Sequence, residues 1–591
     1  MLFSKRIIPA LGAAALIGAL AAPSALASPT QESIIQDNGF VQSNPAAALA
    51  TFKGLGATMV KITVFWNQFA PKPDAKKPPA KFKAADPAAY PAKNWAWLDK
   101  TIREAKKLGI QIGLQPDAPA PTWAAGKGYQ KHPVFKGSWD PSPGAFQSFV
   151  KALGTRYSGK YKPKKGEQPL PRVSWWSVWN EPNFGYSLQP QTLDQGKTLH
   201  SAQEYRQLVR AAWAGLVTTG HTPPKDTILI GETAPRGVGD VNTKKWSDYN
   251  PGLGQMSLAM VFMSQLYCIG QNGKPMTGKT AKTFDCPGSV AKFKKQNPAL
   301  FEASGWAIHP YGQGTPPNET TYDCKGQTFC QSPGNKKRNP YFADFASIPN
   351  VIKSMDRWQS FYGSKNKMQL WNTEFGYWSV PPTKVDPVKQ KGQAISQKTA
   401  AFYMNWAEYL SYQNPRLMSY SQYPYVDPST GVWGSGLVTT ADKPKPEYDA
   451  YMLPFFMPTT KASHATKLTV WGGVRPGAYV LALPKKKQTP VKAMIEFKPV
   501  GGSKGGGKAL STGSSGGSGA SGSGGSGAKP AKGKGATMDG AYTILQTVKI
   551  ANKRGYFLVK RAFTKSGTVR IGWTMPDGKK VYSRTQQIAI G

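Results

Sequence analysis

The chain has 591 residues, more than one ordinary domain needs, so its length predicts at least two domains. Hydrophobic residues make up 40% of the chain and aromatic residues 12%, which is enough for sizeable cores. The 75 Lys and Arg residues against 32 Asp and Glu give a formal net charge of +43. Such an excess occurs in proteins that bind nucleic acid, anionic polysaccharide or a charged cell surface. It also occurs in basic secreted proteins whose lysines are simply solvated, and this interpretation is favoured here.

Residues 1–27 have the pattern of a secretory signal peptide. A charged segment around Lys5 and Arg6 precedes an apolar run, and an Ala-Leu-Ala cleavage site ends at residue 27. No later stretch is apolar over a length that spans a bilayer. The sequence therefore predicts a secreted, extracellular protein, with or without association to the cell surface.

Four cysteines, an even number in an exported chain, favour disulfide bonds. We expect the pairs Cys268–Cys286 and Cys324–Cys330, because each would staple a polar, Gly-rich loop. Metal binding is the rival interpretation. No Cys-x-x-Cys or His-x-x-x-His spacing supports it, so no metal site is expected.

Strand-length apolar runs alternate with amphipathic helical patterns from about residue 36 to residue 453, which predicts βαβ units and a parallel sheet. A first strand is expected near residues 33–37, where the pattern is weak. Eight parallel units close a (β/α)8 TIM barrel, so a catalytic barrel is predicted over residues 28–460. The other seven strands are expected at residues 59–66, 109–116, 173–182, 227–234, 305–311, 369–378 and 416–427.

The pattern changes after residue 458, where short alternating runs predict a small antiparallel β-sandwich over residues 461–591. One of the expected strands is AYVLALP, residues 478–484. A Gly/Ser/Lys-rich tract at residues 501–536 cannot bury enough surface to fold. Because strand patterns flank this tract, we expect a disordered insertion within one sandwich rather than a tether between two modules.

Two carboxylates stand at expected strand ends, where barrel active sites lie: Glu181 and Glu374. Glu181 belongs to the segment Trp-Asn-Glu-Pro-Asn at residues 179–183. This segment resembles the signature of the retaining (β/α)8 glycoside hydrolases, the superfamily of many cellulases, xylanases and β-xylosidases. In that superfamily the acid/base Glu follows an Asn at the end of strand four, and the nucleophile ends strand seven. The strand count assigns these positions to Glu181 and Glu374.

The resemblance implies a double displacement, in which Glu181 acts first as acid and then as base while Glu374 attacks the anomeric carbon. Direct attack requires carboxyl groups about 5–5.5 Å apart. By the same resemblance, Asn180 binds the sugar 2-hydroxyl. A regular strand would point Asn180 and Glu181 to opposite faces, so a local distortion is expected there.

Further candidates for substrate binding are a His and a Tyr at the end of strand six and several aromatic residues that could form sugar platforms. His309 and Tyr311 share one face of their strand and are expected beside Glu374. Many relatives carry Arg on strand two, where this chain has Lys61, which cannot make the planar bidentate contacts of Arg. The candidate platforms are Trp66, Trp123, Tyr377, Trp378, Tyr425 and Trp433, of which two or three are expected to contact sugar.

The sequence thus predicts a secreted retaining glycosidase that hydrolyses O-glycosidic bonds of a polysaccharide or oligosaccharide. The bonds are expected to be β-linked, and no cofactor or metal is expected in the chemistry. The alternative is a non-catalytic glycan- or cell-wall-binding protein on the same barrel. The expected partner is a carbohydrate, with the basic surface open to anionic polysaccharide or cell wall. Nucleic-acid binding is disfavoured, because no binding motif accompanies the charge.

Overall fold

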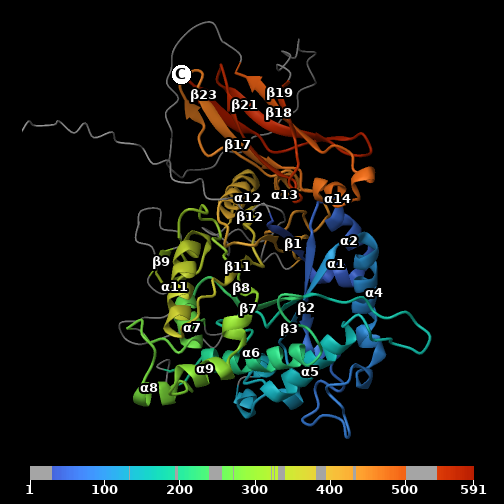
Figure 1. Ribbon diagram of the computed structural model, residues 1–591, viewed down its shortest axis with the longest axis vertical. Helices are drawn as coiled ribbons and strands as arrows, with labels where there is room; N and C mark the ends of the chain where they lie inside the picture. Colours follow the sequence, from blue (N-terminus) through green and yellow to red (C-terminus); the bar gives the residue numbers. More distant parts are fainter. Residues whose placement is uncertain are drawn as a thin grey trace, which may run out of the picture.

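The computed structural model describes residues 30–131, 133–193, 198–237, 256–270, 272–320, 322–324, 327–330, 340–380, 394–429, 434–500 and 542–591. A barrel of strands ringed by helices forms one part of the molecule, and a β-sandwich lies against one end of it (Figure 1). No helix within these ranges is long and apolar enough to cross a bilayer.

Eight parallel strands form the barrel sheet in the order β11-β8-β7-β4-β3-β2-β1-β14. A parallel bridge between Leu370 and Leu417 joins the two ends. The Leu370 N–H donates to Arg416 O at 2.8 Å, and the Leu370 carbonyl oxygen accepts from Met418 N–H at 2.9 Å. The sheet therefore closes, and the predicted barrel and its weak first strand are confirmed. The strands are β1 Glu32–Gln36, β2 Met59–Phe65, β3 Gln111–Asp117, β4 Trp175–Ser177, β7 Thr227–Thr233, β8 Gly305–Ile308, β11 Gln369–Asn372 and β14 Ser419–Gln422.

Helices cover the outside of the barrel between its strands, as the alternation of strand and helix patterns predicted (Figure 1). α4 ends at Gly109, which adopts φ +70°, the left-handed conformation that favours glycine at a helix end. The longer helices are α2 Pro45–Gly54, α4 Ala92–Leu108, α5 Pro143–Arg156, α6 Ser201–Val217, α7 Ala259–Leu266, α11 Ile348–Phe361 and α12 Gln397–Tyr412. The shorter ones are α1 Asn38–Ser43, α3 Trp66–Phe69, α8 Gly278–Thr283, α9 Val290–Gln296, α10 Ala299–Glu302 and α13 Pro446–Met452.

Large side chains fill the barrel interior because glycines on neighbouring strands leave room for them. Trp175 and Trp371 belong to a buried cluster with residues from four other strands. A Cβ on Gly113 would lie 2.1 Å from the Trp175 ring, and one on Gly305 would lie 2.6 Å from the Trp371 ring. The two glycines are therefore needed for this layer of the barrel interior to pack.

The sandwich consists of a three-stranded sheet, β15-β17-β20, and a sheet in the order β16-β23-β21-β18-β19 to which β22 is added. β15 lies before residue 461, so pairing of the sandwich strands begins at Phe455. Almost all pairs are antiparallel, as predicted, and β16 with β23 is parallel. The strands are β15 Phe455–Phe456, β16 Lys461–Ala462, β17 Lys467–Gly473, β18 Lys492–Pro499, β19 Thr543–Lys549, β20 Tyr556–Ala562, β21 Gly567–Thr574, β22 Lys580–Tyr582 and β23 Gln586–Ile590.

The prediction of a strand at residues 478–484 is wrong, because the helix α14, Gly477–Leu481, covers most of this segment. α14 docks on the barrel, because the Tyr479 hydroxyl donates to Ala57 O at 2.5 Å and Lys53 Nζ lies 5.0 Å from the Tyr479 ring. A contact with another domain therefore decides the conformation of a short apolar run whose local pattern is ambiguous.

The Gly/Ser/Lys-rich tract at 501–536 lies outside the described residues, but the strands on either side of it are described. β18 and β19 pair antiparallel, from Lys492 opposite Lys549 to Phe497 opposite Thr543. The tract thus connects two neighbouring strands of one sheet. The signal peptide expected at residues 1–27 also lies outside the described residues.

Buried polar contacts join the sandwich to the barrel. Arg475, which follows β17, makes two 2.7 Å hydrogen bonds to Glu408 on α12, and both side chains are 1% exposed. The Tyr556 hydroxyl on β20 donates to the same carboxylate at 2.6 Å. These contacts lie on the flank and amino-terminal end of the barrel, away from the carboxyl ends of its strands.

The structure contains the predicted disulfide between Cys268 and Cys286. The backbones of Cys324 and Cys330 lie in the short hairpin of β9, Tyr322–Cys324, and β10, Gln327–Cys330. Their side chains are not described, so the second pair stays a prediction. Two further short pairs lie in loops: β5 Thr192–Leu193 with β6 Thr198–Leu199, and β12 Ser379–Val380 with β13 Ile395–Ser396.

Candidate active site

Glu181 and Glu374 follow the carboxyl ends of β4 and β11, the fourth and seventh strands of the barrel. The chain is distorted at Glu181, where φ is +39°, and at Trp179, where φ is +65°. Glu181 N–H donates to Glu232 O at 2.9 Å, which holds the distorted segment against β7. The departure from strand geometry that the sequence required at this point is present, and Asn180 and Glu181 are both half-buried.

One imidazole lies between the two carboxylates. Nδ1 of His309, which follows β8, is 2.9 Å from Glu181 Oε1 and 3.6 Å from Glu374 Oε2. These two oxygens can be no farther apart than the sum of the two distances, about 6.5 Å. The barrel therefore brings together two carboxyl groups that are 193 positions apart in the numbering of the chain.

Three polar groups surround the Glu374 carboxylate. The Tyr311 hydroxyl donates to Oε1 at 2.9 Å, while Oε2 lies 3.6 Å from His309 Nδ1 and 3.8 Å from Lys61 Nζ. Burial raises the pKa of Glu374. The positive charges of His309 and Lys61 lower this pKa, and the negative charge of Glu181 raises it further. A proton on Glu181 removes that last contribution, so ionisation of Glu374 is favoured when Glu181 is protonated.

The sequence interpretation did not single out Glu232, the third carboxylate of this cluster. It lies near the end of β7, is fully buried, and accepts hydrogen bonds from Lys61 Nζ at 2.7 Å and Thr373 Oγ1 at 2.9 Å. His309 Nε2 lies 2.6 Å from the same carboxylate, and the Ser177 hydroxyl donates to its other oxygen. Burial alone would raise the pKa of Glu232, but Lys61 and His309 lower it to about 2.

The His309 ring faces a carboxylate oxygen with each of its nitrogens, an arrangement that favours an imidazolium, which can donate on both sides. Burial by itself would lower the pKa of His309, but Glu374, Glu181 and Glu232 raise it to about 9. The cations Lys61 and His309 then balance the anions Glu232 and Glu374.

Lys61 lies on β2, the strand on which the resemblance noted from the sequence led to an expectation of Arg. Its side chain is fully buried, and its ammonium bridges Glu232 and Glu374. A point charge therefore reaches the second of these carboxylates without the bidentate geometry of a guanidinium. The substitution leaves a cation beside Glu374.

Asn180 lies beside Glu181, and polar groups from β3 hold its backbone and side chain. Its N–H donates to Asp117 Oδ1 at 3.0 Å, and Gln115 Nε2 lies 3.3 Å from Asn180 Oδ1. Gln115 also donates to Trp179 O at 2.6 Å. The expected contact of Asn180 with a sugar hydroxyl stays a prediction.

The aromatic candidates are mostly packed inside the protein. Trp66 is fully buried and stacks on Phe149 at 5.7 Å, and Tyr425 stacks on Phe40 at 5.4 Å. Because protein rings cover their faces, the expectation that Trp66 and Tyr425 are sugar platforms is corrected: they are core residues. Tyr377 and Trp378 are also buried, at 1% and 5% exposure, and Trp433 lies outside the described residues.

A carboxylate at the end of every barrel strand is a candidate for the site, and this rule would have found Glu232 in the segment TILIGET. No family motif surrounds Glu232, so its local sequence does not distinguish it from other carboxylates. His309, Tyr311, Glu181 and Glu374 do lie together as the sequence suggested.

No protein-family model matches the chain, and no match was found among curated proteins. Among solved structures, the chain is similar to a family 39 glycoside hydrolase from Bacteroides cellulosilyticus WH2, with 13% identity, 76% of this chain and 69% of that chain covered, and a TM-score of 0.38. It is also similar to a family 1 β-glucosidase from Thermotoga maritima, with 10% identity, 67% and 81% covered, and a TM-score of 0.41. At these scores the likeness carries no argument about function, and the barrel assignment rests on the closed sheet of this chain.

Proposed function

We propose that the protein is a retaining glycoside hydrolase in which Glu374 is the nucleophile and Glu181 the acid/base. The observation that carries this proposal is the contact of one imidazole, His309, with both carboxylates. The upper limit of about 6.5 Å between the nearest oxygens fits the separation of about 5–5.5 Å used for direct attack. Inverting enzymes place a water between carboxyl groups about 6.5–9.5 Å apart, so this limit favours retention.

The assignment of roles follows from the surroundings of each carboxylate. Glu374 has a hydroxyl donor and two cations beside it, which orient and stabilise an anion. Glu181 is the more exposed of the two, with 17% of its side chain accessible against 8% for Glu374. Its Oε1 can accept a hydrogen bond from His309 Nδ1, while its Oε2 carries a proton that it can transfer to a glycosidic oxygen.

In the first step, the Glu374 carboxylate attacks the anomeric carbon, the bond to the leaving oxygen breaks, and Glu181 transfers its proton to that oxygen. In the second step, Glu181 takes a proton from water, whose oxygen attacks the anomeric carbon and releases Glu374. The anomeric configuration is inverted twice and therefore retained. His309 and Lys61 keep positive charge beside Glu374 throughout.

The protein is further proposed to act outside the cell on a β-linked polysaccharide or oligosaccharide. The Cys268–Cys286 disulfide fits an oxidising compartment. The net charge of +43 fits a protein surface that binds an anionic polysaccharide or a cell wall.

The test is turnover of a panel of aryl β-glycosides, with the anomer of the first product identified by NMR. Glu374→Ala should abolish turnover, and Glu181→Ala should slow substrates with poor leaving groups most, because these need protonation. The exposed residue Glu302 provides a control, since Glu302→Gln should match the unchanged protein. An inverted first product would exclude Glu374 as nucleophile. Equal losses across the leaving-group series would contradict the role of Glu181.

Glycan binding without turnover would instead support the non-catalytic alternative. Calorimetric titration with oligosaccharides from plant, microbial and acidic polysaccharides measures this binding independently of hydrolysis.

A further inference from the structure

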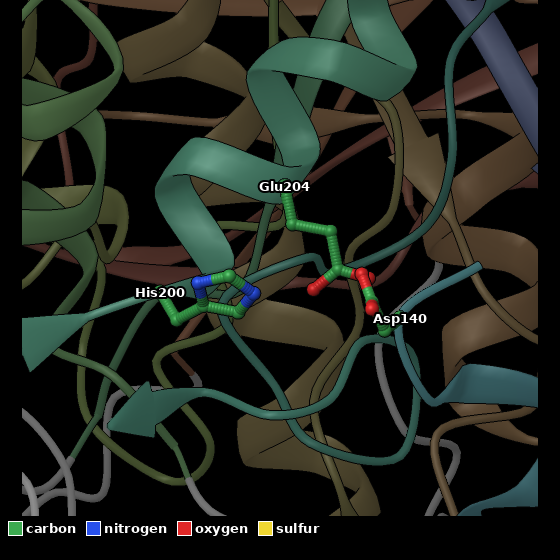
Figure 2. Close-up of side chains that lie close together, drawn as sticks. All are labelled: Asp140, His200 and Glu204. Atoms are coloured by element: carbon green, nitrogen blue, oxygen red, sulfur yellow. The ribbon is translucent and has the colours of Figure 1, made fainter. Parts of the chain in front are cut away.

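A second polar cluster lies away from the carboxylates described above and takes no part in the proposed chemistry. It consists of Asp140, His200 and Glu204, which offer one ligand atom each, and these atoms all lie within 4.8 Å of one another. Asp140 lies in the loop between β3 and α5, His200 directly precedes α6, and Glu204 is in the first turn of α6. Figure 2 shows Glu204 extending from the helix toward Asp140, with the His200 ring beside it.

Glu204 is the residue that makes this cluster unusual. It is 3% exposed, and neither of its carboxylate oxygens has a hydrogen-bond partner within the described part of the chain. His200 Nδ1 also has none there. Buried polar groups are nearly always hydrogen-bonded, and a buried carboxylate is stable only with compensation. A cation placed among these three groups, two of which are buried or half-buried, would supply that compensation.

The local backbone places these groups together. His200 and Glu204 are four residues apart at the start of α6, so their side chains lie on one face of the helix. Asp140 has φ +41°, and its N–H donates to Gln189 O at 2.6 Å, which joins its loop to the segment that precedes β5. Asp140 itself is exposed, so the cluster opens to solvent on that side and a cation can enter.

We propose that Asp140, His200 and Glu204 form a structural binding site for a divalent transition-metal ion of the zinc type. Imidazole nitrogen is a ligand for zinc and its neighbours rather than for calcium or magnesium, and the set contains no soft sulfur ligand. Three protein ligands leave coordination positions for water on the exposed side. Two donors bound to one tetrahedral zinc at about 2.1 Å lie about 3.4 Å apart. The three ligand atoms, which lie within 4.8 Å of one another, therefore need to close by up to about 1.4 Å, a shift that side-chain rotation can supply.

The ion would tie the loop after β3 to the start of α6, which follows the loop that carries Glu181. It would therefore hold two neighbouring loops at the carboxyl ends of the barrel strands. The proposal is independent of the proposed hydrolysis, because none of the three ligands contacts Glu181, Glu374 or His309 in the described structure.

The experiment measures zinc binding to the full chain after treatment with chelator and dialysis. Titration with zinc chloride should give one equivalent bound per chain, a rise in melting temperature, and much weaker binding of calcium chloride under the same conditions. Glu204→Gln and His200→Ala should each weaken zinc binding by about tenfold or more. Asp140→Asn changes an exposed side chain, so it tests the site even if a buried variant fails to fold.

Matched controls are available for both residue types. His464 and Glu302 are exposed and lie outside the cluster, so His464→Ala and Glu302→Gln should leave the stoichiometry and affinity unchanged. The proposal is overturned if the unchanged protein binds no equivalent of zinc. It is overturned equally if Asp140→Asn and Glu204→Gln bind zinc as tightly as the unchanged protein. Calcium bound more tightly than zinc would reject the assigned class of cation.

Discussion

Replacing Glu232 by Gln tests the electrostatic account of the site, because this carboxylate holds both buried cations. Lys61 Nζ and His309 Nε2 lie 2.7 and 2.6 Å from its Oε2, and all three side chains are fully buried. The amide keeps the shape of the side chain but removes its charge. Lys61 and His309 then face each other without an adequate counterion, and the Nζ and Nε2 atoms are 3.5 Å apart.

The magnitude follows in two ways that agree. Removing one partner of a buried ion pair costs about 3–5 kcal/mol of unfolding free energy. Lowering the pKa of Glu232 from 4.5 to about 2 corresponds to about 3 kcal/mol at neutral pH. We expect Glu232→Gln to lose about 3–5 kcal/mol at pH 7.

The pH dependence of this loss has a definite sign. A carboxylate whose folded pKa is lowered contributes stability above its unfolded pKa, and the contribution disappears as the pH falls toward the folded value. The window is therefore pH 4.5 down to about 2. The difference between the unchanged protein and Glu232→Gln should shrink by about 1 kcal/mol between pH 5 and pH 3.5.

The assay is urea denaturation at both pH values, with turnover of an aryl glycoside measured at pH 7. Glu408→Gln is the matched control, because it breaks a buried pair with Arg475 far from the site. Both variants should be destabilised, but only Glu232→Gln should lose activity in the folded protein. Stability within about 0.5 kcal/mol of the unchanged protein, or a difference that grows on acidification, would refute the reasoning.

Three other predictions concern single contacts. Tyr311→Phe removes the 2.9 Å hydrogen bond to Glu374 and should lower kcat about 10–100-fold with little change in melting temperature; an unchanged kcat contradicts the role of the hydroxyl. Removing the disulfide by Cys268→Ser with Cys286→Ser opens a loop of 18 residues and should cost about 3 kcal/mol, read from urea denaturation with and without reductant. Replacing residues 501–535 by an Asn-Gly turn should stabilise by about 1–2 kcal/mol and leave turnover unchanged, and a fall of many degrees in melting temperature would exclude a simple connection between β18 and β19.

Pattern predicted the barrel because each helix buries one face, whereas parallel strands such as β2 and β3 are buried on both faces and therefore read as short continuous apolar runs. The same regularity located Glu181 and Glu374, since a residue that follows a parallel strand must lie at the carboxyl end of the barrel. Gly109 is an example at the level of one residue: Lys106 and Lys107 followed by Gly form a local pattern typical of a helix end, and the left-handed φ of +70° is the reason.

Contacts between segments that are distant in the chain decided what the sequence did not. The run at residues 478–484 is apolar enough for a strand, but docking of Tyr479 on the barrel selects a helix. Trp66 and Tyr425 end strands as platform residues would, yet neighbouring rings cover both. Exposure of an aromatic face depends on which side chains pack on it, and local pattern does not contain this information.

The sequence by itself determined the order of the elements and the two carboxylates, because both depend on local pattern and on the direction of parallel strands. Only the tertiary structure decided that Glu232 holds Lys61 and His309 together, and that Glu204 faces Asp140 and His200. These groups come from segments up to 248 positions apart, and their pKa values and partners depend on distances of a few ångströms in a buried environment. Closure of the barrel sets those distances, and no single segment specifies them.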